Sequence, residues 1–167
     1  YEVIDAAFPE DSEDEALVRF NHYHPLEGKA FEACIRGYGG EACLPTLHEL
    51  ECEGSELAVL FQMMIYEDHD DSQSLEQCME RSYLRFPALA SRLANIYVKR
   101  YETTQDTTYI VRAAECFRYA DAHGMLYSHF IDDLITLYDN WSEPGVLTWT
   151  DEERARLTRL KSLDFER

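Results

Sequence analysis

Apolar residues recur at every third or fourth position along most of the chain, a spacing that places them on one face of an α-helix. The clearest stretches are residues 57–65, 88–97, 107–120 and 125–138. Strict alternation of apolar and polar residues, which is typical of β-strands, is nearly absent. The sequence therefore predicts an all-α protein.

Residues that start and stop helices divide this pattern into separate elements. A helix that opens near Pro25 ends in the glycine-rich region 37–40, because glycine tolerates the left-handed backbone of a helix C-terminus. Ser55 is a predicted N-cap, and Thr150 with Glu153 has the spacing of a capping box. About eight helices are expected, in antiparallel pairs joined by short turns.

The length of 167 residues predicts a single α-helical repeat domain over 1–167. Within it we expect an acidic lead-in and first helix over 1–25, helix pairs over 26–140, and a loop with a capping helix over 141–167. No apolar run approaches the roughly 18 residues of a membrane span, so no membrane insertion is expected.

Two helix pairs carry an internal similarity. Leu93-Ala94-Asn95-Ile96-Tyr97 matches Leu134-Ile135-Thr136-Leu137-Tyr138 at an offset of 41 residues, and Cys78 matches Cys116 at an offset of 38. A helix pair cannot cover its own apolar face, so repeated pairs stack on their neighbours. The prediction is an α-solenoid of stacked antiparallel helix pairs.

The chain resembles the Sel-one-like repeat family, relatives of the tetratricopeptide repeats, over about residues 26–140. The Ala113-Ala114-Glu115-Cys116 helix ending at Gly124 carries this likeness, together with Tyr97 and Tyr138 of the Leu-x-x-x-Tyr pattern. The run 29–34 followed by 40–43 further resembles the cysteine-rich exported branch, in which a disulfide clamps the two helices of one repeat. The resemblance implies a non-catalytic protein that binds other proteins. In Gram-negative bacteria some exported members look like immunity proteins that neutralise a secreted antibacterial toxin.

The net charge is strongly negative, at −18, with 33 acidic against 15 basic residues. Such a field repels nucleic acid and anionic lipid and favours a partner protein with a basic surface. No Lys or Arg occurs between Arg36 and Arg81, although simple solubility charge remains the alternative explanation. Phe61, Met63, Met64 and the tyrosines would anchor a partner if exposed, but the core is the favoured place for them. The predicted partner-binding acids are Glu49, Glu51, Glu53, Glu56, Glu67, Asp68, Asp70 and Asp71.

Five cysteines and a start without Met favour an exported protein whose signal peptide is already removed, periplasmic or secreted. The alternative is a cytoplasmic protein with buried thiols. Cys34 and Cys43 flank the Gly39-Gly40 turn between two predicted antiparallel helices, which makes them the best candidate disulfide. The pairing of the other three cysteines cannot be deduced.

The sequence predicts no catalytic, cofactor or metal-ligating residue. The helix around His48 has Cys52 where a zinc protease has its second His, and the acidic run 67–71 lacks the central glycine of a calcium loop. The resemblance implies, as the most concrete function, an immunity protein that binds and neutralises a secreted toxin. The alternatives are an envelope or secretion-system scaffold or chaperone and, less favoured, a metal-binding protein or enzyme that uses His129, Asp132 and Asp133.

Overall fold

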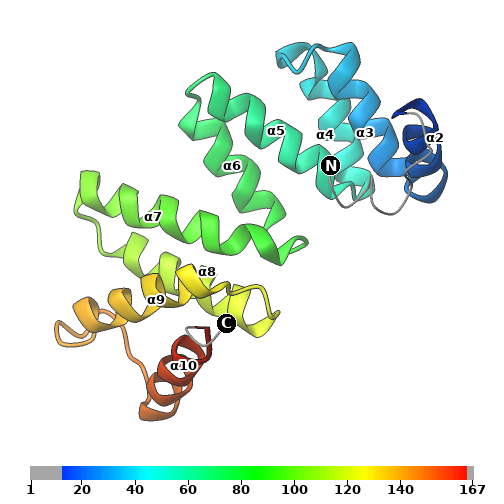
Figure 1. Ribbon diagram of the computed structural model, residues 1–167. Helices are drawn as coiled ribbons and strands as arrows, with labels where there is room; N and C mark the ends of the chain where they lie inside the picture. Colours follow the sequence, from blue (N-terminus) through cyan, green and yellow to red (C-terminus); the bar gives the residue numbers. More distant parts are fainter. Residues whose placement is uncertain (1–12, 165–167) are drawn as a thin grey trace. The chain divides into compact units, whose positions relative to one another are not determined.

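The computed structural model describes residues 13–164, and this part of the chain holds nine α-helices and no β-strand (Figure 1). The all-α prediction is confirmed, with nine helices where about eight were expected. None of the described helices has the length and apolar character needed to cross a bilayer. The helices are α2 (Glu13–Tyr23), α3 (Pro25–Arg36), α4 (Leu44–Glu53), α5 (Glu56–Asp68), α6 (Ser72–Ser82), α7 (Ala90–Thr104), α8 (Thr108–Ala122), α9 (Ser128–Trp141) and α10 (Asp151–Asp164).

The chain divides into two compact units, and the division falls inside α6, between residues 78 and 79. Unit 1 contains α2 to α5 and most of α6. Unit 2 contains the end of α6 and α7 to α10. Short 3-10 turns, Glu41–Cys43 and Pro87–Leu89, lead into α4 and α7. Each unit has its own buried residues and is described by itself.

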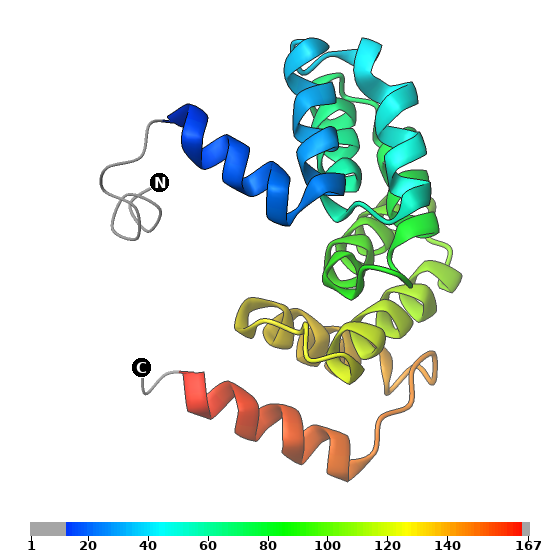
Figure 2. The ribbon, with the colours of Figure 1, turned by 90° about the vertical axis from the view of Figure 1, so that its right-hand side faces the viewer.

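In unit 1, α3 packs against both α4 and α5, and α2 packs against α3 (Figure 2). The glycine-rich turn after α3 brings the start of α4 back against the end of α3. A Cβ atom on Gly37 would lie 2.8 Å from the Cβ of Cys43, so only glycine permits this close return. The core of the unit consists of Ala30, Cys43, Leu47, Leu50, Ala58 and Ile65.

The N-terminus of α5 is held by two side chains. The Ala58 N–H donates to Ser55 Oγ at 3.0 Å, which confirms Ser55 as the N-cap. The Glu27 carboxylate on α3 accepts hydrogen bonds from Ser55 Oγ (2.5 Å) and from the backbone N–H groups of Glu56 and Leu57 (both 3.0 Å). Since Glu27 lies in the first turn of α3, the two helices start side by side and run in the same direction.

In unit 2, α7 packs along α8, α8 contacts α9, and α9 contacts α10. Small residues on the facing sides of α7 and α8, including Ala94, Ala113 and Ala114, are buried and let the two backbones approach closely. The matched repeat residues Leu93, Tyr97, Leu134 and Tyr138 are all buried as well. The internal similarity therefore follows equivalent core positions.

An aromatic stack joins α10 to the rest of unit 2. The Tyr138 and Trp149 rings are stacked at 4.6 Å, and Arg118 and Arg154 lie over the Tyr138 and Trp149 rings, at 5.2 and 4.5 Å. The capping box is confirmed, because the Thr150 N–H donates to Glu153 Oε2 at 2.9 Å and the Glu153 N–H donates to Thr150 Oγ1 at 3.1 Å. The stack and the cap together fix where α10 begins.

The buried thiol of Cys116 predicts how the stability of unit 2 changes with pH. Burial, with smaller contributions from the nearby Glu115 and Glu80, raises its pKa from 9.0 to about 12. Above about pH 9 the unfolded chain loses this proton while the folded chain keeps it. The free energy of unfolding should therefore fall by about 1.4 kcal/mol per pH unit, starting near pH 9 and ending near pH 12.

Urea unfolding at about pH 8 and about pH 10 measures this loss before most tyrosines ionise. Cys116→Ala should be less stable at both pH values, because it leaves a cavity, but should lack the cysteine's share of the pH dependence. Cys52→Ala, at an exposed position in unit 1, should retain the full pH dependence of the unmodified protein. An equal pH dependence in Cys116→Ala and the unmodified protein would contradict the assignment.

Candidate functional site

The predicted partner-binding acids do not form one surface. Glu53 and Glu56 flank the N-terminus of α5, whereas residues 67–71 lie at its C-terminus, about 17 Å away along the helix. Charges at that separation are screened from each other, since the Debye length is about 8 Å at physiological salt. Glu49 is exposed on α4 four residues before Glu53, so it lies on the same side of that helix as Glu53 and away from residues 67–71.

Glu51 is the one predicted partner-binding residue that the structure buries. Glu51 lies with Leu47 and Leu50 on the buried face of α4, and the residue is 7% exposed. The Glu51 carboxylate accepts a hydrogen bond from Gln62 Nε2 at 2.7 Å and lies 3.4 Å from His48 Nδ1. The assignment of Glu51 to a partner surface is therefore wrong, because helical spacing places it inside.

The acids at the C-terminus of α5 occupy an unfavourable position. Glu67 and Asp68 lie in the last turn, where the helix dipole carries partial negative charge and disfavours further carboxylates. Asp71 is different, because the Ser74 side chain and backbone N–H hydrogen-bond to its carboxylate and lower its pKa. A cation that approached Glu67 and Asp68 would relieve this repulsion.

Exposed apolar side chains lie at the same end of unit 1. Ile35 in the last turn of α3 is 55% exposed, and Tyr38 in the following turn is 98% exposed. On α5, Met64 is 55% exposed, whereas Met63 is buried and Phe61 is only half-buried. The 3-10 turn that follows α3 approaches the end of α5, since Glu41 Oε1 lies 3.7 Å from His69 Nδ1.

We call Ile35, Tyr38, Met64, Glu67 and Asp68 the acidic-apolar face. The Phe31 and Phe61 rings, 6.4 Å apart, join α3 to α5 one helical turn before Ile35 and Met64. The sequence pattern did not distinguish Ile35 as a surface residue, and it indicated Tyr38 only as one of the tyrosines that would anchor a partner if exposed. The helical spacing of Phe31, Ile35 and Tyr38 is visible in the sequence, but the spacing does not show that α4 and α5 leave this stripe uncovered.

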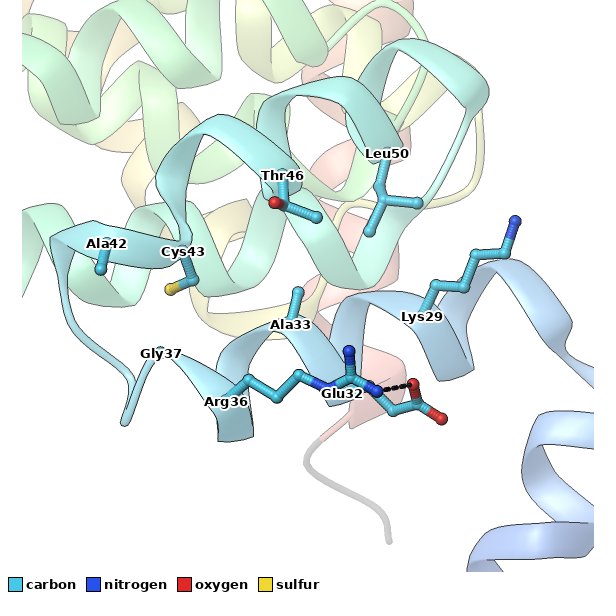
Figure 3. Close-up of a pocket in the computed structure, with 9 residues that line it drawn as sticks. All are labelled: Lys29, Glu32, Ala33, Arg36, Gly37, Ala42, Cys43, Thr46 and Leu50. Atoms are coloured by element: carbon cyan, nitrogen blue, oxygen red, sulfur yellow. Dashed lines mark hydrogen bonds and ion pairs between the residues drawn. The ribbon is translucent and has the colours of Figure 1, made fainter.

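A hollow of about 440 Å³ lies between α3 and α4 (Figure 3). Lys29 and Arg36 stand at its two ends, and Arg36 Nη2 lies 3.4 Å from Glu32 Oε2. Cys43 lines the wall and donates a hydrogen bond to the Gly40 carbonyl oxygen at 2.8 Å. The hollow therefore contains charges of both signs and favours neither an anion nor a cation.

The predicted disulfide partners are neighbours in this region. Cys34 and Cys43 are separate thiols in the structure, and a hydrogen bond joins their side chains. Burial raises the pKa of the Cys43 thiol, and the adjacent Cys34 raises it further. The turn thus brings the two residues together as expected, while a covalent bond between them stays a prediction.

Unit 2 contains a second hollow, of about 460 Å³, between α7, α8 and α9. Val98, Ile110, Phe117 and Leu137 supply its apolar surface. The polar and aromatic residues that line it are Asn95, Tyr101, Glu102, Asp133, Thr136, Asn140 and Trp141. We call this hollow the α7–α9 groove.

The residues weighed as metal ligands have other contacts. Lys161 Nζ lies 2.5 Å from Asp132 Oδ1, and Asn95 Nδ2 donates to Asp133 Oδ2 at 3.4 Å. The His129 ring lies against Phe130 at 3.9 Å. In the part of the chain that the structure describes, no three His, Cys, Asp or Glu side chains converge on a common point.

Comparison with protein-family models, with curated proteins and with solved structures finds no match to this chain. The Sel-one-like resemblance therefore stays a prediction. What the two surfaces bind has to be argued from their own geometry and charge.

Proposed function

We propose that the chain is a non-catalytic protein-binding module whose partner carries a basic surface. The observation that carries this proposal is the acidic-apolar face of unit 1, where Ile35, Tyr38 and Met64 are exposed near the ends of α3 and α5, and Met64 lies one helical turn before Glu67 and Asp68. Exposed aromatic and methionine side chains are typical of interface centres, and charged residues are typical of interface rims. An apolar segment flanked by Lys or Arg would complement this face.

The charge of the chain supports the same partner. Residues 37–80 include many carboxylates and no Lys or Arg, so this segment has a strongly negative net charge. Such a field attracts a cationic protein during diffusion and raises the association rate more than the final affinity. Glu67 and Asp68 would strengthen binding locally, because a cation of the partner would offset the repulsion between these carboxylates and the negative end of the α5 dipole.

The most concrete form of this proposal is an exported immunity protein, periplasmic or secreted, that occludes a secreted antibacterial toxin. This form combines the basic partner with the family resemblance described above. An envelope or secretion-system scaffold or chaperone would use the same face for several clients at weaker affinity. Stoichiometry distinguishes the two, since an immunity protein forms one tight one-to-one complex.

The test is capture of partners from the cell-envelope fraction with the unmodified protein and with Glu67→Lys/Asp68→Lys. We expect one stoichiometric basic partner, and the charge reversal should lower its association rate at least about tenfold at low salt. Glu49→Lys, at an exposed position outside the face, should have a much smaller effect. An association rate that does not change with salt or with Glu67→Lys/Asp68→Lys would refute the role of this face.

A further inference from the structure

We propose that the α7–α9 groove binds an alkylguanidinium or alkylammonium group, such as the side chain of an arginine or lysine in a peptide. The groove lies wholly in unit 2, so this inference goes beyond the acidic-apolar face and does not depend on it. Its volume of about 460 Å³ is within the range of roughly 300–1,000 Å³ that is typical of ligand pockets.

Residues of α7 and α9 contact each other across the groove at two levels along the helices. Since α7 and α9 each run antiparallel to α8, they run in the same direction as each other. The Asn95 amide reaches the Asp133 carboxylate at one end, and Tyr101 meets Trp141 at the other. Along α7 these two ends are separated by about 10 Å, which suits the extended stem of a long side chain.

The charge of the groove selects a cation. Asp133 and Glu102 are both exposed, and no Lys or Arg is among the residues that line the groove. The amides of Asn95 and Asn140 add carbonyl oxygens that accept hydrogen bonds. Guanidinium and ammonium groups are donor-only cations, so this set of acceptors satisfies them and disfavours an anion.

The apolar and aromatic residues of the groove would contact the aliphatic stem and the cationic group of the bound side chain. The half-buried Val98 would cover aliphatic methylene groups, and the buried Ile110 and Phe117 form the floor beneath it. The Tyr101 and Trp141 rings meet edge to face, with centroids 4.8 Å apart at 84°. Each ring is half-buried, and a cation placed over an aromatic face of Trp or Tyr is attracted to it.

Intrinsic fluorescence tests the site in the full-length chain. The chain has two tryptophans, so Trp149→Phe leaves Trp141 as the sole reporter and keeps an aromatic ring at position 149. The probe is a blocked Gly-Arg-Gly peptide, with the citrulline analogue as an uncharged control of the same shape. We expect a saturable change in Trp141 fluorescence with the arginine peptide and at least about tenfold weaker binding of the citrulline peptide.

Charge-removing variants locate the site. Asp133→Asn and Glu102→Gln should each weaken binding of the arginine peptide about tenfold, whereas Glu143→Gln, outside the groove, should not. Binding of agmatine as tightly as the peptide would identify a free cation as the ligand, and preference for the peptide would identify a protein segment. Equal affinity for the arginine and citrulline peptides, or full affinity in both groove variants, would overturn the proposal. Neither result depends on the unit 1 face.

Discussion

Replacing Glu27 with alanine should lower the free energy of unfolding of unit 1 by about 2 kcal/mol. The Glu27 carboxylate accepts three hydrogen bonds at the N-terminus of α5, from Ser55 Oγ and from the backbone N–H groups of Glu56 and Leu57. Hydrogen bonds to a charged acceptor are stronger than neutral ones, and a negative charge at a helix N-terminus is also favoured by the helix dipole. Removal leaves these donors to water or to weaker partners.

Urea unfolding of the full-length chain, with amide hydrogen exchange in α5 as the probe, measures this loss of free energy of unfolding. Glu32→Ala is a matched control on the same helix, because its pairing with Arg36 is exposed and should contribute less than about 0.5 kcal/mol. Glu27→Gln keeps the size of the side chain and one acceptor oxygen, so it should fall between the two. Equal stability of Glu27→Ala and Glu32→Ala would show that Glu27 does not hold α5.

The second large effect concerns α10. Trp149→Ala should lower the free energy needed to detach α10 from unit 2 by about 3 kcal/mol. The reason is that the Trp149 ring stacks on the buried Tyr138 ring and lies beneath the Arg154 guanidinium. Leu157 is the fully buried apolar side chain that the structure describes on α10. Arg156 also holds the helix, through two hydrogen bonds to the largely buried Asp121 carboxylate of α8, whereas the Arg154–Asp139 and Lys161–Asp132 pairs are exposed and contribute little each.

Amide hydrogen exchange detects the release region by region. In Trp149→Ala, protection should fall in α10 and remain in α7 and α8, whose contacts with each other do not involve Trp149. Arg159→Ala, at an exposed position on α10, is the control and should leave protection unchanged. High salt should act in the same direction as Trp149→Ala but more weakly, since it screens the Arg154–Asp139 and Lys161–Asp132 pairs. Unchanged protection of α10 in Trp149→Ala would contradict the role of the stack.

Local signals in the sequence predicted individual helices well. Ser55 caps α5, and Thr150 and Glu153 form the capping box at α10, as their spacing indicates. These interactions join residues three positions apart, so the sequence contains all the information that they require. The all-α class follows in the same way, because the apolar period is a local property.

Burial of particular side chains was less predictable. Phe61, Met63 and Met64 belong to one apolar run, yet Met63 is buried and Met64 is 55% exposed. Glu51 looks like its acidic neighbours in the sequence but lies inside, bonded to Gln62. A helix can be covered on one, two or three sides, and only its neighbours in space decide which.

The sequence by itself determined that this protein is helical and strongly acidic and where several of its helices begin. The tertiary structure alone decided which carboxylates reach solvent, that Ile35, Tyr38 and Met64 are exposed, and that Asn95 meets Asp133 and Tyr101 meets Trp141. The physical reason is the range of the interactions. Caps and helical periods act within one or two turns, whereas a face or a groove depends on side-chain packing between segments far apart in the chain.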